Sequence, residues 1–114
     1  MADYSGKVMW PFGAAQVEKP AFAATIAIVV ANHMAVIEPA ILTGACTLSL
    51  TPTAEVRAGA LVFVKQKATA TETLTFAGSA KAPALVGAAG KTKVQALVFD
   101  GTFFVAQGAP VQID

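Results

Sequence analysis

The sequence carries few charges, and this scarcity excludes one class of partner. Only 13% of its 114 residues are charged, against about 25% in an average soluble domain. The eight basic and seven acidic residues nearly cancel, and Arg57 is the only arginine. Proteins that bind nucleic acids concentrate basic side chains on one face and use arginine to grip phosphates. We therefore expect no nucleic-acid partner.

The residues that usually carry chemistry are also scarce. Cys46 is the only cysteine, so the chain cannot close an internal disulfide, and His33 is the only histidine, which disfavours a metal site. We interpret Cys46 as a buried strand residue. The seven carboxylates form no motif, and Gly90-Lys91-Thr92 lacks the first glycine that a phosphate-binding loop requires. We expect no catalytic residue, no cofactor and no metal, and hence no enzyme.

The apolar fraction, 55%, is high for so few charges. One explanation is burial of surface against other copies or a larger assembly. The other is membrane insertion of residues 21–37, but that run is shorter than the roughly 20 residues of a spanning helix. It also carries Asn32 and His33, and it is rich in β-branched residues. We expect no membrane partner, and the polar amino terminus predicts synthesis in a cytoplasm without a secretory signal.

Short apolar runs with period-two alternation dominate the chain and are separated by glycine, proline and polar turns. They predict an all-β fold, a small β-sandwich or jelly roll of about eight short antiparallel strands, with no helix of ordinary length. We expect a single β domain over residues 21–114. The predicted strands lie within residues 22–31, 34–37, 47–51, 60–67, 71–76, 92–99, 102–107 and 111–113, with at most a short one near Leu85-Val86.

Turn chemistry predicts two hairpins. Asp100-Gly101 between apolar runs favours a two-residue turn with positive φ, and Asn32-His33 is interpreted as a second turn with Met34–Ile37 as the returning strand. The run from Ala60 to Lys67 is apolar on both faces at its start, so we expect it to be central or to lie against another subunit.

Aromatic residues suggest where a partner binds. We interpret residues 1–20 as an amino-terminal arm, in which Trp10 and Phe12 flank a proline. These two side chains either cap the domain's own core or anchor the arm on a neighbour, and we take them as candidate partner-binding residues. Phe103 and Phe104 are adjacent in a predicted strand and must face opposite ways, so one of them is available to a partner.

The carboxy-terminal half resembles the head-fibre and capsid-decoration proteins of tailed bacteriophages. The matching stretches are Thr71-Glu72-Thr73-Leu74-Thr75-Phe76, Gly90-Lys91-Thr92, Phe99-Asp100-Gly101-Thr102-Phe103-Phe104 and Val111-Gln112-Ile113-Asp114. The resemblance implies a β-rich, usually trimeric protein that docks on a capsid shell and has no catalytic residues. The chain contains no long coiled-coil or fibre repeat, which favours a compact decoration protein.

These observations predict a non-enzymatic virion structural protein that forms a homotrimer and decorates or stabilises a phage capsid. Its partners would be further copies of itself and the major capsid protein, and it would reside in the virion after synthesis in the host cytoplasm. The alternative is a monomeric β-sandwich module that binds a ligand or a carbohydrate. One tryptophan and one tyrosine make the chain poor in sugar-stacking residues.

Overall fold

The computed structural model describes residues 15–114 and contains eleven strands and no helix in that part of the chain. The all-β prediction is confirmed. The strands are β1 (Gln16–Glu18), β2 (Thr25–Val30), β3 (Met34–Ile37), β4 (Cys46–Pro52), β5 (Leu61–Lys67), β6 (Thr73–Gly78), β7 (Ala80–Lys81), β8 (Leu85–Val86), β9 (Thr92–Phe99), β10 (Phe104–Ala106) and β11 (Val111–Gln112).

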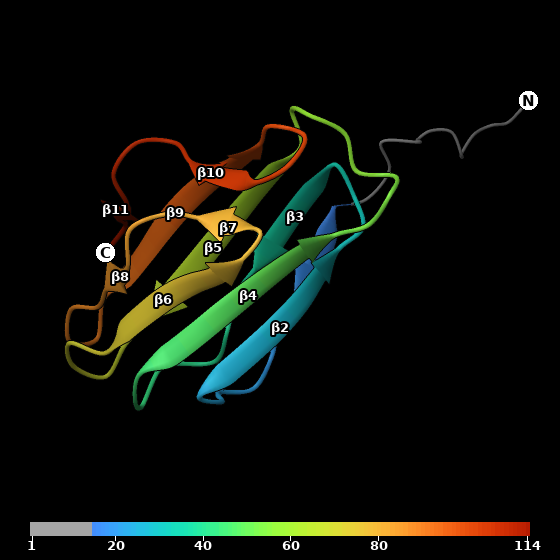
Figure 1. Cartoon of the computed structure of the whole chain (residues 1–114). Coiled ribbons are helices and arrows are strands. Elements are labelled where there is room, and N and C mark those ends of the chain that lie inside the picture. The colour runs from blue at the N-terminus through green and yellow to red at the C-terminus, as the bar shows by residue number, and fades with distance from the viewer. Residues whose placement is uncertain (1–14) are drawn as a thin grey trace, which may run out of the picture.

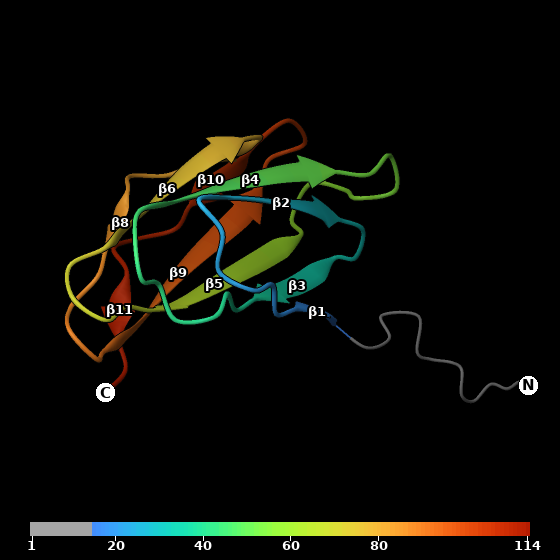
Figure 2. The same ribbon diagram turned by 90° about the horizontal axis from the view of Figure 1, so that it is seen from below.

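The strands form two sheets that lie face to face (Figures 1 and 2). The larger has the order β1-β3-β5-β9-β10-β7, with β11 also paired to β9, and the smaller has the order β2-β4-β6-β8. From β1 to β6 the chain alternates between the sheets, so that each strand lies beside the one two places earlier. We call one passage through both sheets a coil: β1–β2, β3–β4 and β5–β6.

Within the coils every strand pairing is parallel. Strand β3 pairs with β1 and β5, and β4 pairs with β2 and β6, all in parallel register. The prediction of antiparallel strands is therefore wrong for this part of the chain, and the arrangement differs from a jelly roll. The physical reason is that each connection crosses to the opposite sheet and returns in the same direction, as in solenoid proteins.

The Asn32-His33 hairpin prediction is also wrong. These residues do form a bend, but the strands on either side belong to different sheets: β2 pairs with β4, and β3 pairs with β1 and β5. The bend carries the chain across the core instead of folding it back in one sheet. The His33 carbonyl accepts a hydrogen bond from the Leu61 N–H at 2.9 Å, which ties this crossing to the start of β5.

Beyond β6 most pairings are antiparallel, as turn chemistry predicts, and the exception is β7, which pairs parallel with β10. Strand β9 pairs antiparallel with β5, β10 and β11, and β8 pairs antiparallel with β6. Gly101 has φ +103°, and the Asp100 N–H donates to the Phe103 carbonyl at 2.9 Å, so the turn before β10 has Gly101-Thr102 at its centre. The prediction of a two-residue turn with positive φ at Gly101 is confirmed, but its central residues are Gly101-Thr102 and not Asp100-Gly101.

One core fills the space between the sheets. Alternation along each strand sends every second side chain inward: in β2 the residues Ile26, Ile28 and Val30 are buried, and in β5 Val62, Val64 and Gln66 are buried. Leu48 and Leu50, predicted to face the core, have no exposed surface. Strand β5 lies between β3 and β9, which confirms that it is central. In the described part of the chain, no helix is long and apolar enough to cross a membrane.

Candidate interaction surfaces

The exposed carboxylates support loops and turns. Asp100 accepts hydrogen bonds from the N–H groups of Phe103 (2.7 Å) and Thr102 (2.8 Å), and these bonds lower the pKa of its carboxyl. The Thr69 hydroxyl at 2.6 Å, followed by the Ala70 N–H at 2.7 Å, lowers the pKa of Glu72. Each bond stabilises the charged form of its carboxylate. Their partners are backbone and hydroxyl groups of the same loops, which indicates a structural role.

Asp114 links the carboxy terminus to β9. The Thr92 N–H donates to Asp114 Oδ1 at 2.7 Å and lowers the pKa of this carboxyl. Among residues 15–114, no three histidine, cysteine, aspartate or glutamate side chains gather where they could hold a metal ion.

Cys46 is 2% exposed at the start of β4, and burial raises the pKa of its thiol. The interpretation of this residue as a buried strand cysteine is confirmed. A buried thiol with a raised pKa is a poor nucleophile, because the reactive species is the thiolate.

The outward face of the larger sheet is unusually apolar. Ten aliphatic or aromatic side chains alternate with the inward-pointing core residues of β1, β3, β5, β9, β10 and β11. They are Val17, Met34, Val36, Leu61, Phe63, Val94, Ala96, Val98, Val105 and Val111. We call this set the apolar face. Val17, Met34 and Val111 are 56%, 44% and 60% exposed.

Strand register aligns the apolar face into rows. One row runs Val17, Val36, Phe63, Ala96 across four adjacent strands. A second runs Met34, Leu61, Val98, Val105. Neither row contains a charged residue on these four strands, but the second row ends at Lys81 of β7, which lies opposite Val105. In the next row Lys65 lies opposite Val94 and approaches Glu38 at 3.9 Å.

The outward face of the smaller sheet has a different chemistry. Its residues are mainly hydroxyl-bearing: Thr25, Thr47 and Thr75 form one row, and Ala27, Ser49 and Ala77 form the next. We call this set, together with Thr51 and Thr73, the hydroxyl face. It confirms the alternation predicted for residues 47–51, with leucines in the core and hydroxyls outside. Threonine suits an exposed strand surface, because its branched side chain packs while its hydroxyl stays hydrated.

Phe103 and Phe104 face opposite ways, as predicted. Phe104 is fully buried, and its ring centroid lies 4.7 Å from that of Phe99. Phe103 is 38% exposed, and the Lys81 ammonium lies 4.8 Å from its ring centroid. Phe103 is thus the member of the pair that a partner could reach.

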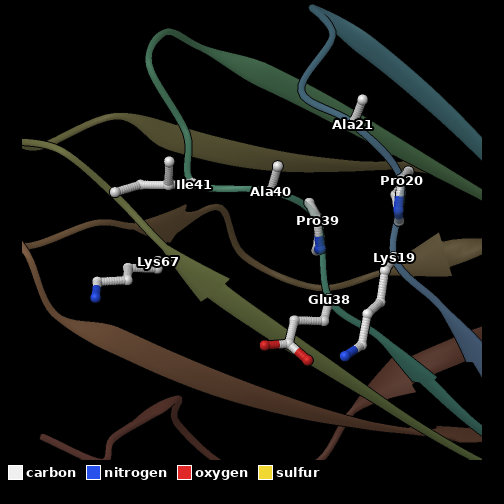
Figure 3. Close-up of a pocket in the computed structure, with 8 residues that line it drawn as sticks. All are labelled: Lys19, Pro20, Ala21, Glu38, Pro39, Ala40, Ile41 and Lys67. Atoms are coloured by element: carbon white, nitrogen blue, oxygen red, sulfur yellow. The ribbon is translucent and has the colours of Figure 1, made fainter.

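A shallow pocket lies at the corner where the first two coils turn between the sheets. Figure 3 shows its lining: Lys19, Pro20, Ala21, Glu38, Pro39, Ala40, Ile41 and Lys67. Backbone hydrogen bonds stack these segments, because the Ala40 N–H donates to the Pro20 carbonyl at 2.9 Å and the Glu38 N–H to the Glu18 carbonyl at 2.8 Å. The pocket is mostly aliphatic and open, and its few polar groups do not converge on one point as in a specific ligand site.

The candidate anchors Trp10 and Phe12 lie outside the described residues. Residues 16–18 of the predicted arm form β1 and pair with β3. Sequence reasoning did not identify the apolar face as a whole. Its one signal was the apolar start of the run from Ala60 to Lys67, which includes Leu61 and Phe63.

In comparisons with known proteins, no family model, no curated protein and no solved structure matches the chain.

Proposed function

We propose that this protein is a non-enzymatic structural protein of a phage virion, whose copies associate as a homotrimer and decorate the capsid. The apolar face is the observation that carries this proposal. Two rows of exposed or half-buried aliphatic and aromatic side chains cross four adjacent strands without a charge, and Lys81 of β7 closes the second row. Large contiguous apolar surfaces mark sites of protein association.

The apolar face also accounts for the unusual composition. Burying apolar surface contributes roughly 25 cal/mol for each Å² removed from water. A sheet face offers this area on a rigid support, so little side-chain and backbone freedom is lost on association. The flanking pair of Lys65 and Glu38 would form part of the polar rim that surrounds such an interface.

The virion context rests on the resemblance of the carboxy-terminal half to head-fibre and capsid-decoration proteins. In that context the major capsid protein is the second partner, and Trp10 and Phe12 are the candidate anchors on it. The protein would then reside in the virion after synthesis in the host cytoplasm.

Self-association is tested by replacing a central residue of the apolar face. Phe63→Lys places a charge in the middle of one row, where burial in an interface would leave it unpaired. We expect light scattering coupled to size exclusion to give about three times the 11.6-kDa chain mass for the wild type. The variant should dissociate, with affinity weakened roughly 100-fold.

Thr47→Lys is the matched control, because Thr47 occupies an equivalent outward position on β4 of the other sheet. It should leave the mass unchanged. A monomeric wild type, or equal loss of mass in both variants, would contradict assembly through the apolar face. A monomer would favour the alternative of a ligand- or carbohydrate-binding module.

Capsid docking needs a separate test. Purified shells of the phage that encodes the chain, stripped of this protein, would be sedimented with the wild type and with the Trp10→Ala/Phe12→Ala variant. We expect co-sedimentation of the wild type and its loss in the variant, since both proteins keep an intact apolar face. If the two proteins bind the shells equally well, Trp10 and Phe12 do not contribute to docking.

A further inference from the structure

Among residues 15–114, the first coil leaves one long strand edge without a neighbour. In that part of the chain, strand β2 lies at the end of the smaller sheet and pairs only with β4. The Thr47 N–H donates to the Ala24 carbonyl and the Thr53 N–H to the Val30 carbonyl, so even-numbered residues of β2 direct their backbone groups toward β4. The backbone groups of Thr25, Ala27 and Val29 therefore point away from β4. Figure 1 shows β2 as the edge strand beside β4.

Within the described residues, the outward backbone groups of β2 find hydrogen-bond partners at one end of the strand only. The Gln16 side chain reaches from β1 to β2: its Nε2 donates to the Val29 carbonyl at 2.8 Å, and its Oε1 accepts from the Ala31 N–H at 2.8 Å. The side-chain amide thus takes the place of one peptide unit of a neighbouring strand. The N–H and carbonyl groups of Thr25 and Ala27 and the N–H of Val29 have no such substitute among residues 15–114.

The opposite end of the same sheet is protected. Strand β8 has two residues, and the Lys93 ammonium donates to the Val86 carbonyl on it at 2.8 Å. Short edge strands and lysine side chains are the usual means by which proteins prevent edge-to-edge pairing. Strand β2 has neither, because it spans six residues without a charge or a proline.

We propose that the β2 edge of one copy pairs antiparallel with the β2 edge of a second copy, about a two-fold axis midway between the two Ala27 residues. In this register the two Ala27 residues exchange both backbone hydrogen bonds, and Thr25 pairs with the Val29 of the second copy. The N–H and carbonyl groups that lack a partner on one β2 edge would thus pair with the same groups on the β2 edge of the second copy. The Val29 carbonyl has a second lone pair, so the Gln16 bond is retained.

Three features favour a second copy as the occupant. The set Thr25, Ala27, Val29 is symmetric about its middle residue, as an isologous contact requires. No charges meet across the axis, because β2 carries none. Head-to-tail pairing is opposed by Lys93 at the other end of the sheet. The contact is separate from the apolar face, which belongs to the other sheet, and it would join trimers only at protein concentrations above those at which the trimer mass is measured.

A disulfide trap tests the contact in the full chain. In a Cys46→Ala background, Ala27→Cys places an exposed thiol at the axis, where it lies opposite its symmetry mate. Mild oxidation should give a covalent dimer as the main product on a non-reducing gel. Ser49→Cys is the control, because Ser49 lies beside Ala27 in the same row but one strand inside the sheet. The Ser49→Cys variant should stay monomeric on the non-reducing gel.

Absence of the dimer in Ala27→Cys, or equal yields in the two variants, would overturn the proposal. Wild-type protein supplies a second measurement, since the Ala27 N–H should exchange with solvent more slowly as protein concentration rises. Fast exchange at every concentration would also overturn it. Adding Phe63→Lys to the Ala27→Cys chain separates the two contacts: the trap should still close when the apolar face is disabled.

Discussion

The parallel coils and the antiparallel carboxy-terminal region are built from contacts of different range. In the coils, Thr25 lies beside Thr47, and Cys46 lies beside Leu74, so partners are separated by a passage through the opposite sheet. In the carboxy-terminal region, Phe99 pairs with Phe104 across one tight turn. Local turn chemistry can specify the second kind of pairing. The first kind depends on inward-facing apolar residues that meet only when both sheets form.

The two regions also differ in what stabilises their loops. The carboxy-terminal region relies on exposed carboxylates, since Asp100 supports the β9–β10 turn and Asp114 binds the Thr92 N–H. In the coils the Glu72 carboxylate supports the β5–β6 loop in the same way, but close backbone contacts also constrain the chain there, and Gly78 is the clearest example. A Cβ added there would lie 2.5 Å from Ser49 Oγ and 2.7 Å from the Leu50 carbonyl oxygen of β4.

The largest predicted effect therefore comes from Gly78→Ala. Gly78 has φ +67°, which costs an L-residue about 1–2 kcal/mol. The added methyl group also meets the backbone of β4, which cannot move without disturbing the parallel ladder. We expect the free energy of unfolding, measured with urea, to fall by roughly 3 kcal/mol or more.

Gly108→Ala is the matched control in the carboxy-terminal region. Gly108 has φ +73°, but nothing lies within 4 Å of an added Cβ. This variant should lose about 1 kcal/mol, the conformational part alone. If the free energy of unfolding falls by a similar amount in the two variants, the coils tolerate the extra methyl group. The proposed difference in packing between the two regions would then be wrong.

A smaller effect is expected from the two buried glutamines. Gln66 on β5 is 1% exposed, and its Oε1 has no hydrogen-bond partner among the described residues. Gln95 on β9 is 2% exposed, and its Nε2 donates to the carbonyls of Ala96 (3.0 Å) and Gly108 (3.1 Å). An unsatisfied buried polar atom costs about 1–3 kcal/mol. We expect Gln66→Met to raise the free energy of unfolding by about 1 kcal/mol.

Gln95→Met should act in the opposite direction and lower the free energy of unfolding by about 1 kcal/mol, because it removes two hydrogen bonds. Thermal and urea unfolding of both variants would measure the difference. A loss of stability in Gln66→Met as large as that in Gln95→Met would show that the Gln66 oxygen is satisfied, for example by a bound water.

The smallest expected effect is the response to acid. The pKa values of Asp100, Asp114 and Glu72 are lowered in the folded chain, so their contribution is full above their unfolded pKa values, near 4, and is lost as pH falls through the folded values. The urea concentration at the midpoint of unfolding should therefore decrease when the pH is lowered below about 4. Amide exchange should increase first where these three carboxylates bind: the β9–β10 turn, the carboxy terminus and the loop of residues 69–72.

Asp100→Asn should flatten this pH dependence, because the amide oxygen can still accept from the Phe103 and Thr102 N–H groups but no longer titrates below neutrality. Glu55 is exposed and accepts no hydrogen bond from the described residues, so Glu55→Gln serves as the control and should leave the profile unchanged. If amide exchange at low pH instead increases first in β2 and β4, the expected order in which the two regions open would be wrong.

Much of the fold could be predicted from the sequence where the signal is local. Period-two alternation located β4, β5, β6 and β9, and Asp100-Gly101 located the turn before β10. The Asn32-His33 bend was found, but its partner strands were wrong. A bend of polar residues shows that the chain changes direction, and it does not show whether the next strand joins the same sheet or the opposite one.

The candidate surface was less predictable. Alternation shows that Leu61 and Phe63 share a face, but the apolar face exists only through register, which places Val17 beside Val36 and Val36 beside Phe63. Register between parallel strands depends on contacts across the core, and no turn residue encodes it. Trp10 and Phe12 were selected for their size, and their role stays a prediction.

The alternation of the chain between two sheets has a consequence for how such a protein can change over generations. Neither sheet corresponds to a continuous piece of the gene, because each coil contributes one strand to both. Duplication or deletion of a complete coil would lengthen or shorten both layers together and preserve the match between them. Loss of a single strand would leave its opposite layer uncovered, so the coil, and not the strand, is the unit in which this architecture can grow.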